Sequence, residues 1–404
     1  MAESASKNKN RINPKFIVAA GTLIMLLLGV AYVWGVYVDP LMEEFGWSSA
    51  RASWPFSVFL LAYTVGMIVG GRLQDIYGPR PICLIGAVLF GAGYFLSGLA
   101  TNLIFLCITY GVIGGFGTGF AYVTPVSTVV KWFPERKGLM SGIVIFGFGA
   151  GSFIFSPLVS WIIQNFSWQI AFYSLGVLFL VLTVGSSFFM ILPSDGEEEE
   201  TSEESHAVRD YTPFEMLKTP GFWLAWIGWF FALSVGLGVM GHVVNYAIGT
   251  GVIAFWAAFI LSIVAVFNGL GRVLTGAISD KVGGLLMLAL SCFGMGLSAL
   301  LFYFSAGNLW MFYTIAILFG FSFGALLVLY PVITAELFGV EHMGANYGIL
   351  FSSYGIGGFV GPVVFGQLHD LTTSYSPALL LSTVLCAVAA GLIIILRNIR
   401  ENVS

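Results

Sequence analysis

Twelve long apolar stretches dominate this sequence and restrict the folds open to it. A helix needs about 20 apolar residues to cross the hydrocarbon core of a bilayer, and each stretch meets that length. Every backbone N–H and C=O group must be hydrogen-bonded there, which favours helices as the spanning elements. We therefore predict an all-α integral membrane protein. The predicted spans are residues 16–38, 54–71, 81–100, 103–129, 139–163, 169–192, 221–246, 253–276, 285–305, 309–335, 344–366 and 376–396.

Composition supports this class and excludes others. The chain is 58% hydrophobic and only 9% charged, whereas soluble domains average about 25% charged residues. A net charge of -4 without a dense basic patch excludes nucleic-acid binding. The four cysteines lie in apolar runs, which is typical of buried side chains and not of disulfides or metal sites. We expect neither a cofactor nor a metal, and we expect a monomer.

The cations predict the orientation in the membrane. If both termini are cytoplasmic, fourteen of the 16 Lys and Arg residues lie on that side, in agreement with the positive-inside rule. Arg51 is then outside, and Arg272 lies within a span. Residues 1–15 are polar and basic and have no signal-peptide pattern, so we predict a cytoplasmic N-terminal tail. The short loops favour a multi-pass protein of a prokaryotic plasma membrane, the cell inner membrane.

A glutamate-rich segment over residues 193–219 divides the chain. Such a run repels itself and stays solvated, so we predict a flexible acidic linker on the cytoplasmic side. It separates a first six-helix bundle, residues 16–192, from a second, residues 220–404.

The two parts also repeat each other. GRLQDIYGPR at 71–80 matches GAISDKVGG at 276–284 with an offset of 205 residues, and KWFPERKGLMSG at 131–142 matches ELFGVEHMGANYG at 336–348. A duplicated six-span unit is typical of transporters built from two parallel repeats, with substrate bound between the halves near the middle of the membrane. We predict two pseudo-symmetric six-helix bundles.

Arg272 is the strongest candidate for a binding residue. An arginine within a span costs at least about 2.5–3.5 kcal/mol, so its presence calls for a compensating partner. Asn268, Thr275 and Ser279 lie on the same helical face, which predicts a polar stripe turned toward a cavity. An arginine could instead snorkel to the nearby surface. Its side chain should, however, lean toward the N-terminus of its own helix and thus toward mid-membrane. The repeat partner of Arg272 is Met67, so the duplication does not explain this charge.

Other polar side chains are weaker candidates. Tyr122, Tyr330 and Tyr354 could donate to a bound carboxylate, although a tyrosine in a membrane protein more often serves packing. His242 is a candidate proton relay or a wetted structural residue near a span end. Asp75, Arg80 and Asp280 lie in the repeated turns, where we predict switchable gating contacts between helix ends. Leu28, Trp34 and Tyr63 are further candidates for the cavity wall.

Several motifs resemble a known family. GVYVDPLMEEFGWS, KWFPERKGLMSGI, TPFEMLKTPGFWLAW and GLGRVLTGAISDKVG are similar to the oxalate/formate antiporter and monocarboxylate transporter branch of the major facilitator superfamily. The resemblance covers essentially all twelve spans. It implies the major facilitator fold and alternating access of two bundles around a central anion site. It also implies that Arg272 holds the substrate carboxylate, and that Tyr122 and Tyr330 line the site.

The chain departs from the family pattern in three places. Dicarboxylate-exchanging relatives carry a lysine on the eleventh span, where this chain has Phe351–Tyr354 without a lysine. Proton-coupled monocarboxylate transporters typically carry an aspartate where this chain has Asn268. The arginine usual after the first loop aspartate is Ile76.

With one buried cation, a dianion would keep an unpaired charge, so the sequence favours small monocarboxylates such as lactate, pyruvate, acetate, glycolate or formate. Transport would be by proton symport or anion exchange. Alternatives are an oxalate/formate-type dicarboxylate antiporter and a carrier for a non-carboxylate substrate such as a drug or sugar. A membrane enzyme would need a nucleophile, a metal cluster or an acid–base pair, which the spans lack, so we expect no enzyme. A non-transporting receptor usually adds a long soluble tail.

Overall fold

The structure, a computed structural model, describes residues 13–193, 209–305 and 307–401. In this described part all regular elements are helices, and twelve spans are long and apolar enough to cross a membrane. The predicted all-α fold with twelve spans is thereby confirmed. Most of the predicted N-terminal tail and the glutamate run of the predicted linker, residues 1–12 and 194–208, lie outside the described residues.

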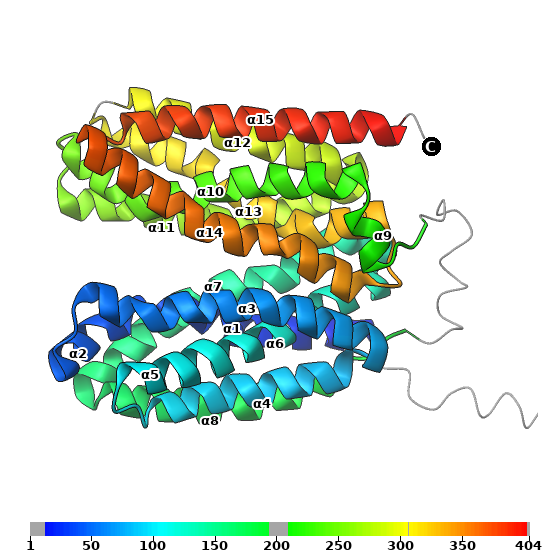
Figure 1. Cartoon of the computed structure of the whole chain (residues 1–404), viewed down its shortest axis with the longest axis horizontal. Helices are drawn as coiled ribbons and strands as arrows, with labels where there is room; N and C mark the ends of the chain where they lie inside the picture. The colour runs from blue at the N-terminus through cyan, green and yellow to red at the C-terminus, as the bar shows by residue number, and fades with distance from the viewer. Residues whose placement is uncertain (1–12, 194–208, 306, 402–404) are drawn as a thin grey trace, which may run out of the picture.

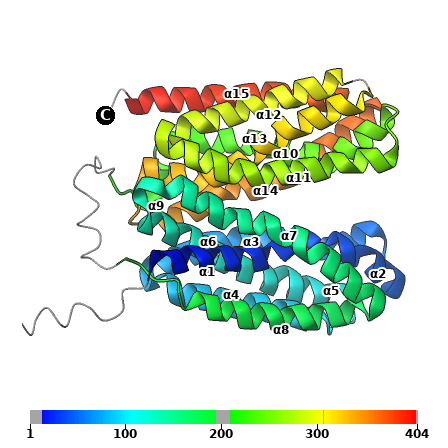
Figure 2. The ribbon, with the colours of Figure 1, turned by 180° about the vertical axis from the view of Figure 1, so that it is seen from behind.

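The helices form two bundles that lie side by side (Figures 1 and 2). The first bundle contains α1 (Pro14–Leu28), the 3-10 segment η1 (Gly29–Val33), α2 (Gly35–Phe45), α3 (Ser49–Tyr77), α4 (Pro79–Ser97), α5 (Leu103–Leu106), the π-helical segment η2 (Cys107–Gly114), α6 (Gly115–Trp132), η3 (Pro134–Arg136), α7 (Lys137–Asn165) and α8 (Trp168–Ser187). After the short α9 (Pro213–Leu217), the second bundle contains α10 (Pro220–Gly249), α11 (Ala254–Val282), α12 (Gly284–Phe304), α13 (Leu309–Phe338), α14 (Met343–Thr372) and α15 (Ser376–Glu401).

Helix α1 begins and α15 ends at the same end of the molecule, the tail end (Figure 1). The opposite end is the far end. Because α3 and α11 run toward the tail end while α7 and α14 start there, the repeated turns predicted as gates all lie at the tail end. The most extensive contacts between the bundles join α11 to α7 and α14 to α3. These two crossings form the seam between the bundles.

The first span differs from its prediction over residues 16–38. The α-helix ends at Leu28, a 3-10 segment follows, and a separate helix α2 starts at Gly35. Gly29 lies at this break, directly against the backbone of Phe148 and Gly151 on α7. A Cβ at Gly29 would collide with the Phe148 carbonyl oxygen. The apolar pattern could not reveal the break, because it depends on a close approach to another helix.

The described end of the predicted linker packs on the second bundle. The Asp210 carboxylate accepts hydrogen bonds from the backbone N–H groups of Val340 and Glu341, at 2.8 and 2.9 Å. Thr212 caps α9, and its N–H and hydroxyl groups hold the pKa of the Glu215 carboxyl below its usual value. The chain from residue 209 onward is therefore fixed to the loop between α13 and α14.

Candidate substrate-binding site

Arg272 lies in the seam between the bundles. Its side chain is only 4% exposed, and its Nη1 donates a hydrogen bond of 2.7 Å to the Ile145 carbonyl of α7. The Nε atom is buried and has no hydrogen-bond partner in the part of the chain that the structure describes. Within the described residues Arg272 forms no ion pair with an acidic side chain. The guanidinium thus neither faces lipid nor is neutralised by a carboxylate of the described chain.

The direction of this side chain follows from its contacts with α7. The Arg272 backbone lies against Gly142, whereas its guanidinium lies beside Gly149. The seven-residue offset between these glycines corresponds to about 10 Å along a helix. Because α7 starts at the tail end, the guanidinium points away from that end, as the lean of helical side chains predicts. It does not snorkel to the tail end.

The predicted polar stripe faces the protein interior. Asn268, Thr275 and Ser279 are all buried, like Arg272. The Ser279 hydroxyl donates to the Gly276 carbonyl, and the Thr275 hydroxyl has no partner. Among the described residues, the amide of Asn268 makes no hydrogen bond and is one turn from Arg272 toward the far end. A polar group of a ligand beside Arg272 would find free donors and acceptors here.

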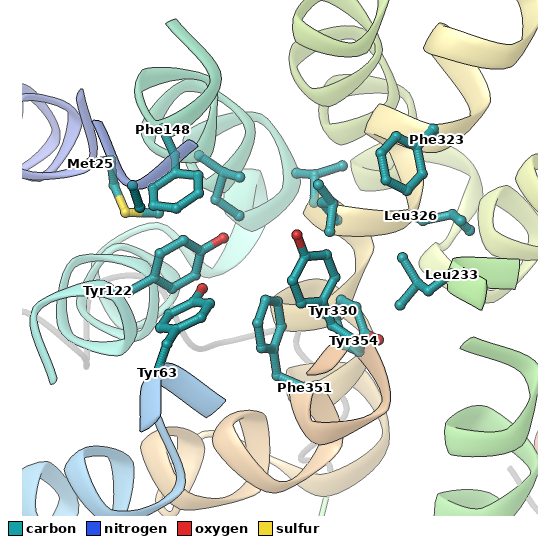
Figure 3. Packing of buried hydrophobic residues seen from close by; sticks show 14 of the residues in the cluster. Met25, Tyr63, Tyr122, Phe148, Leu233, Phe323, Leu326, Tyr330, Phe351 and Tyr354 are labelled. Atoms are coloured by element: carbon teal, nitrogen blue, oxygen red, sulfur yellow. The ribbon is translucent and has the colours of Figure 1, made fainter. Parts of the chain in front are cut away.

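Aromatic rings from both bundles meet at the level of Arg272. Figure 3 shows Tyr63 and Tyr122 of the first bundle facing Tyr330 and Phe351 of the second. Phe351 lies 5.9 Å from the Tyr63 ring and 5.7 Å from the Tyr122 ring, measured between centroids. The Tyr330 hydroxyl pairs with Ser353, and its ring stacks on Trp229. The structure therefore brings Tyr122 and Tyr330 to the seam, and their contact with substrate stays a prediction.

Tyr354 also reaches across the seam. Its hydroxyl forms a short hydrogen bond with the hydroxyl of Tyr32, which lies in the 3-10 segment of the first span. The positive charge of Arg272 acts on the phenol groups of Tyr32, Tyr122, Tyr347 and Tyr354. Of these, the phenols of Tyr32, Tyr122 and Tyr354 are candidates to donate to an anion bound at the guanidinium.

The sequence interpretation missed two of these phenols and misplaced one aromatic residue. Tyr32 reaches the seam where the first helix breaks, and GVAYVWG at residues 29–35 offers only a glycine at each end as a signal. Tyr347 lies in the repeated motif at 336–348, beside the glycine that repeats. Trp34, a candidate for the cavity wall, instead packs on Tyr110 and donates to the Ala52 carbonyl within the first bundle.

At the tail end, the two loop aspartates join the bundles. The Asp75 carboxylate accepts hydrogen bonds from the N–H groups of Gly344 and Ala345, at 3.0 and 2.8 Å. In the pseudo-equivalent contact, Asp280 accepts from Gly138 and Leu139, at 2.6 and 2.9 Å. Each carboxylate thus caps the first turn of α14 or α7 in the opposite bundle, where a negative charge also interacts favourably with the helix dipole.

Close backbone packing accompanies these caps. Gly71 lies against the Gly344 carbonyl and Gly276 against the Gly138 carbonyl, so that a Cβ at either position would collide with the oxygen. Lys137 forms an ion pair of 3.8 Å with Glu336, which links α7 to α13. Most of the polar contacts described between the bundles accordingly lie at the tail end, and those of Arg272 with Ile145 and of Tyr32 with Tyr354 lie farther along the seam.

Two predicted residues lie apart from these contacts. Arg80 covers the Phe188 ring at 5.1 Å within the first bundle, so its predicted gating role remains a prediction. His242 lies toward the far end of α10, with Nε2 3.2 Å from the Pro362 carbonyl and Nδ1 3.4 Å from the Tyr375 hydroxyl. It lines a cavity of about 10 Å³, enough for roughly one water, with Phe365 and Tyr375. The structure does not bring His242 to Arg272.

The sequence profile of the Major Facilitator Superfamily matches this chain over residues 19–362 and again over 257–403. The chain belongs to the major facilitator superfamily. The double match agrees with the internal duplication.

Curated relatives place this facilitator in the predicted branch. The chain is 28% identical over 341 residues to the oxalate:formate antiporter of Oxalobacter formigenes. The alignment covers 84% of this chain and 80% of the antiporter. It is 26% identical over 376 residues to monocarboxylate transporter 13 of Rattus norvegicus, covering 92% and 86%. The resemblance to the oxalate/formate antiporter and monocarboxylate transporter branch is confirmed, and the chain is a transporter of this branch.

A solved structure supports the fold of this facilitator. The transporter FucP in the outward conformation superposes with a TM-score of 0.72 at 15% identity, covering 94% of this chain and 98% of that one. At this identity the likeness supports the fold alone.

Proposed function

We propose that this chain is a secondary carrier for small monocarboxylate anions that works by alternating access, with proton symport or anion exchange. One observation carries the proposal: the buried guanidinium of Arg272 lies in the seam with no carboxylate beside it among the described residues. A buried charge without an ionic partner is costly, and a bound carboxylate would neutralise it. The planar fork of arginine can donate two parallel hydrogen bonds to one carboxylate.

The distribution of positive charges favours a substrate with a single negative charge. The described Lys and Arg residues other than Arg272 lie near helix ends, and the segment Phe351–Tyr354 supplies an aromatic ring, two hydroxyls and a phenol. A second carboxylate of a dianion would face aromatic rings and neutral donors, so that its desolvation is poorly compensated. Lactate, pyruvate, acetate and formate fit this pattern better than oxalate.

The contacts at the tail end support alternating access. Asp75 and Asp280 close that end in two equivalent places, on the tail side of Arg272. We propose that these caps break and re-form as the bundles rock about the seam, which exposes Arg272 alternately to each side. With both termini cytoplasmic in a prokaryotic plasma membrane, as the cations favour, the tail end faces the cytoplasm.

His242 lies apart from Arg272, so it can couple transport to protons only by acting on the Arg272 site from a distance. The pH dependence of uptake by His242→Ala decides this role. A pH profile identical to that of the unsubstituted carrier removes His242 from the coupling.

Selective uptake tests the proposed function. Proteoliposomes containing the full chain would be loaded with unlabelled lactate, and entry of radiolabelled lactate, formate and oxalate would be compared. We expect lactate or formate to enter well above the protein-free background and oxalate to enter poorly. Preferred oxalate uptake would refute the monocarboxylate assignment, and uptake of none of the three would refute the carboxylate carrier.

A further inference from the structure

Among the described residues, three buried hydroxyl groups on helices of the seam make no hydrogen bond of normal geometry. They belong to Ser141 on α7, Thr275 on α11 and Tyr347 on α14, and all three residues are fully buried. The Nε of Arg272 lacks a partner as well. Buried polar groups in native proteins are nearly always paired, so each of these groups calls for an explanation.

Several other buried hydroxyls in the same bundles are satisfied within their own helix. Thr118, Thr124 and Ser298 each donate to the carbonyl oxygen four residues earlier, at 2.7–2.9 Å. This local bond is the usual one for Ser and Thr inside helices. Ser141 and Thr275 do not make it, although nothing in their helices removes the carbonyls. Their hydroxyls are therefore free for a partner that this conformation does not supply.

The Ser and Thr hydroxyls lie at one level of the seam. Gly138 packs on Gly276, and four residues farther along α7 Gly142 packs on Arg272. The serine of α7 and the threonine of α11 lie between these two contacts, one on each helix. Both are thus on the tail side of the guanidinium, at the crossing that must open when the tail end opens.

The internal repeat relates Ser141 to a residue at the other crossing, between α3 and α14. Ser141 and Tyr347 are pseudo-equivalent, because each directly precedes the repeated glycine that packs across the seam. Each also lies seven residues before an aromatic residue near Arg272: Phe148 on α7, whose ring packs on Tyr122, and Tyr354 on α14. Two helical turns correspond to about 10 Å, and both helices start at the tail end. The backbone positions of the serine and the tyrosine are therefore about two turns closer to that end than the aromatic site.

Tyr347 connects the two levels. Its hydroxyl is near that of Tyr122, without a hydrogen bond of normal geometry, and it lies within the field of Arg272.

We propose that Ser141, Thr275 and Tyr347, the hydroxyl layer, form a second carboxylate subsite that fills as the bundles part at the tail end. This inference rests on the proposed function and adds a release step to it. The hydroxyls rotate to donate hydrogen bonds to the carboxylate. The Nε–H of Arg272 donates to the same carboxylate, so that the anion stays bound while it moves toward the water on the tail side. While the tail end is closed, the layer is dry and takes no part in binding from the far side.

Single-group substitutions test the layer. Thr275→Val, Tyr347→Phe and Ser141→Ala each remove one hydroxyl with little change in shape. The matched control is Thr183→Val, which removes an equally buried and unpaired hydroxyl from α8, a helix that packs within the first bundle. Labelled lactate uptake would be measured in membrane vesicles of both orientations. A C-terminal tag identifies the vesicles that expose the tail end.

We expect Thr275→Val and Tyr347→Phe to raise the half-saturation concentration for lactate from the tail side by about 10-fold, the loss of one hydrogen bond to a charged group. Ser141→Ala should show a smaller rise in the same direction. Half-saturation from the far side should stay within about two-fold of the unsubstituted carrier, and Thr183→Val should change neither value.

Two results overturn the inference while the proposed function stands: uptake that depends on Arg272 but has unchanged tail-side half-saturation in the three variants, or equal losses from both sides. Equal losses would make these hydroxyls part of the main site. If one variant fails to insert, the other two still carry the comparison between the tail side and the far side. An unsubstituted carrier that transports no lactate, or an Arg272→Gln variant that transports it normally, refutes the proposed function itself.

Discussion

The two crossings of the seam share one frame but differ in charge. At both, a loop aspartate caps the first turn of a helix in the opposite bundle, and a glycine just before it packs on a backbone carbonyl. At the α7–α11 crossing the next turn carries Arg272, whereas the α3–α14 crossing has Met67 at the equivalent position. We therefore propose that the duplicated contacts form the frame that moves and that the charge of Arg272 selects the substrate.

Removal of the charge should have the largest effect. Arg272→Gln keeps hydrogen-bonding groups but loses the charge, and we expect lactate uptake to fall about 100-fold, since hydrogen bonds to charged groups contribute about 1.5–3 kcal/mol each. Initial rates in proteoliposomes measure this. Uptake within a few-fold of the unsubstituted carrier would mean that the difference between the crossings has no role in binding.

The second-largest effect should come from crowding the glycine contacts that both crossings share. Gly71→Ala and Gly276→Ala place a Cβ against a carbonyl oxygen of the opposite bundle, so we expect each to disfavour closure of the tail end about 10-fold, in line with overpacking costs of about 1–3 kcal/mol. Spin labels at Arg136 and Glu341, one on each bundle at the tail end, would report a longer distance. An effect at one crossing alone would break the proposed equivalence.

Loss of the capping charges should be milder. Asp75→Asn and Asp280→Asn keep an acceptor but remove the charge at the helix N-terminus, so each should shift the same spin-label equilibrium toward separation by about three- to ten-fold. The double variant should show the product of the two shifts, because the caps lie at separate crossings. A double variant no different from either single one would show that only one cap holds the tail end closed.

The smallest effect is expected at the uncharged crossing. Met67→Leu conserves apolar character and nearly conserves volume, so uptake should stay within about two-fold. This variant is the matched control for Arg272→Gln. A large loss here would show that the position matters through packing and not through charge.

Much of this architecture was predictable from the sequence because it depends on patterns along one chain. Apolar length located the twelve spans, and the repeat around Asp75 and Asp280 indicated two equivalent halves. The stripe through Asn268 and Arg272 indicated an inward-facing polar surface. Each of these inferences needs only the periodicity of a helix or the comparison of two segments.

The remainder depends on which helix faces which, and sequence patterns do not encode that. The partner of Arg272 is the backbone carbonyl of Ile145, a group that every residue carries. The break at Gly29 follows from contact with α7, and it is this break that lets Tyr32 reach Tyr354. The acceptors of the loop aspartates were likewise not predictable, because they are backbone N–H groups of the opposite bundle.

Equilibrium binding to the purified carrier tests the central claim most directly. Thermal unfolding of the unsubstituted protein, Met67→Leu and Arg272→Gln would be followed with lactate, formate and oxalate at equal concentration and ionic strength. A ligand that binds the folded state raises the unfolding temperature. We predict that lactate or formate stabilises the first two proteins and leaves Arg272→Gln unchanged, with a weaker effect of oxalate. Equal stabilisation of Arg272→Gln, or the largest shift with oxalate, would contradict a one-charge carboxylate site.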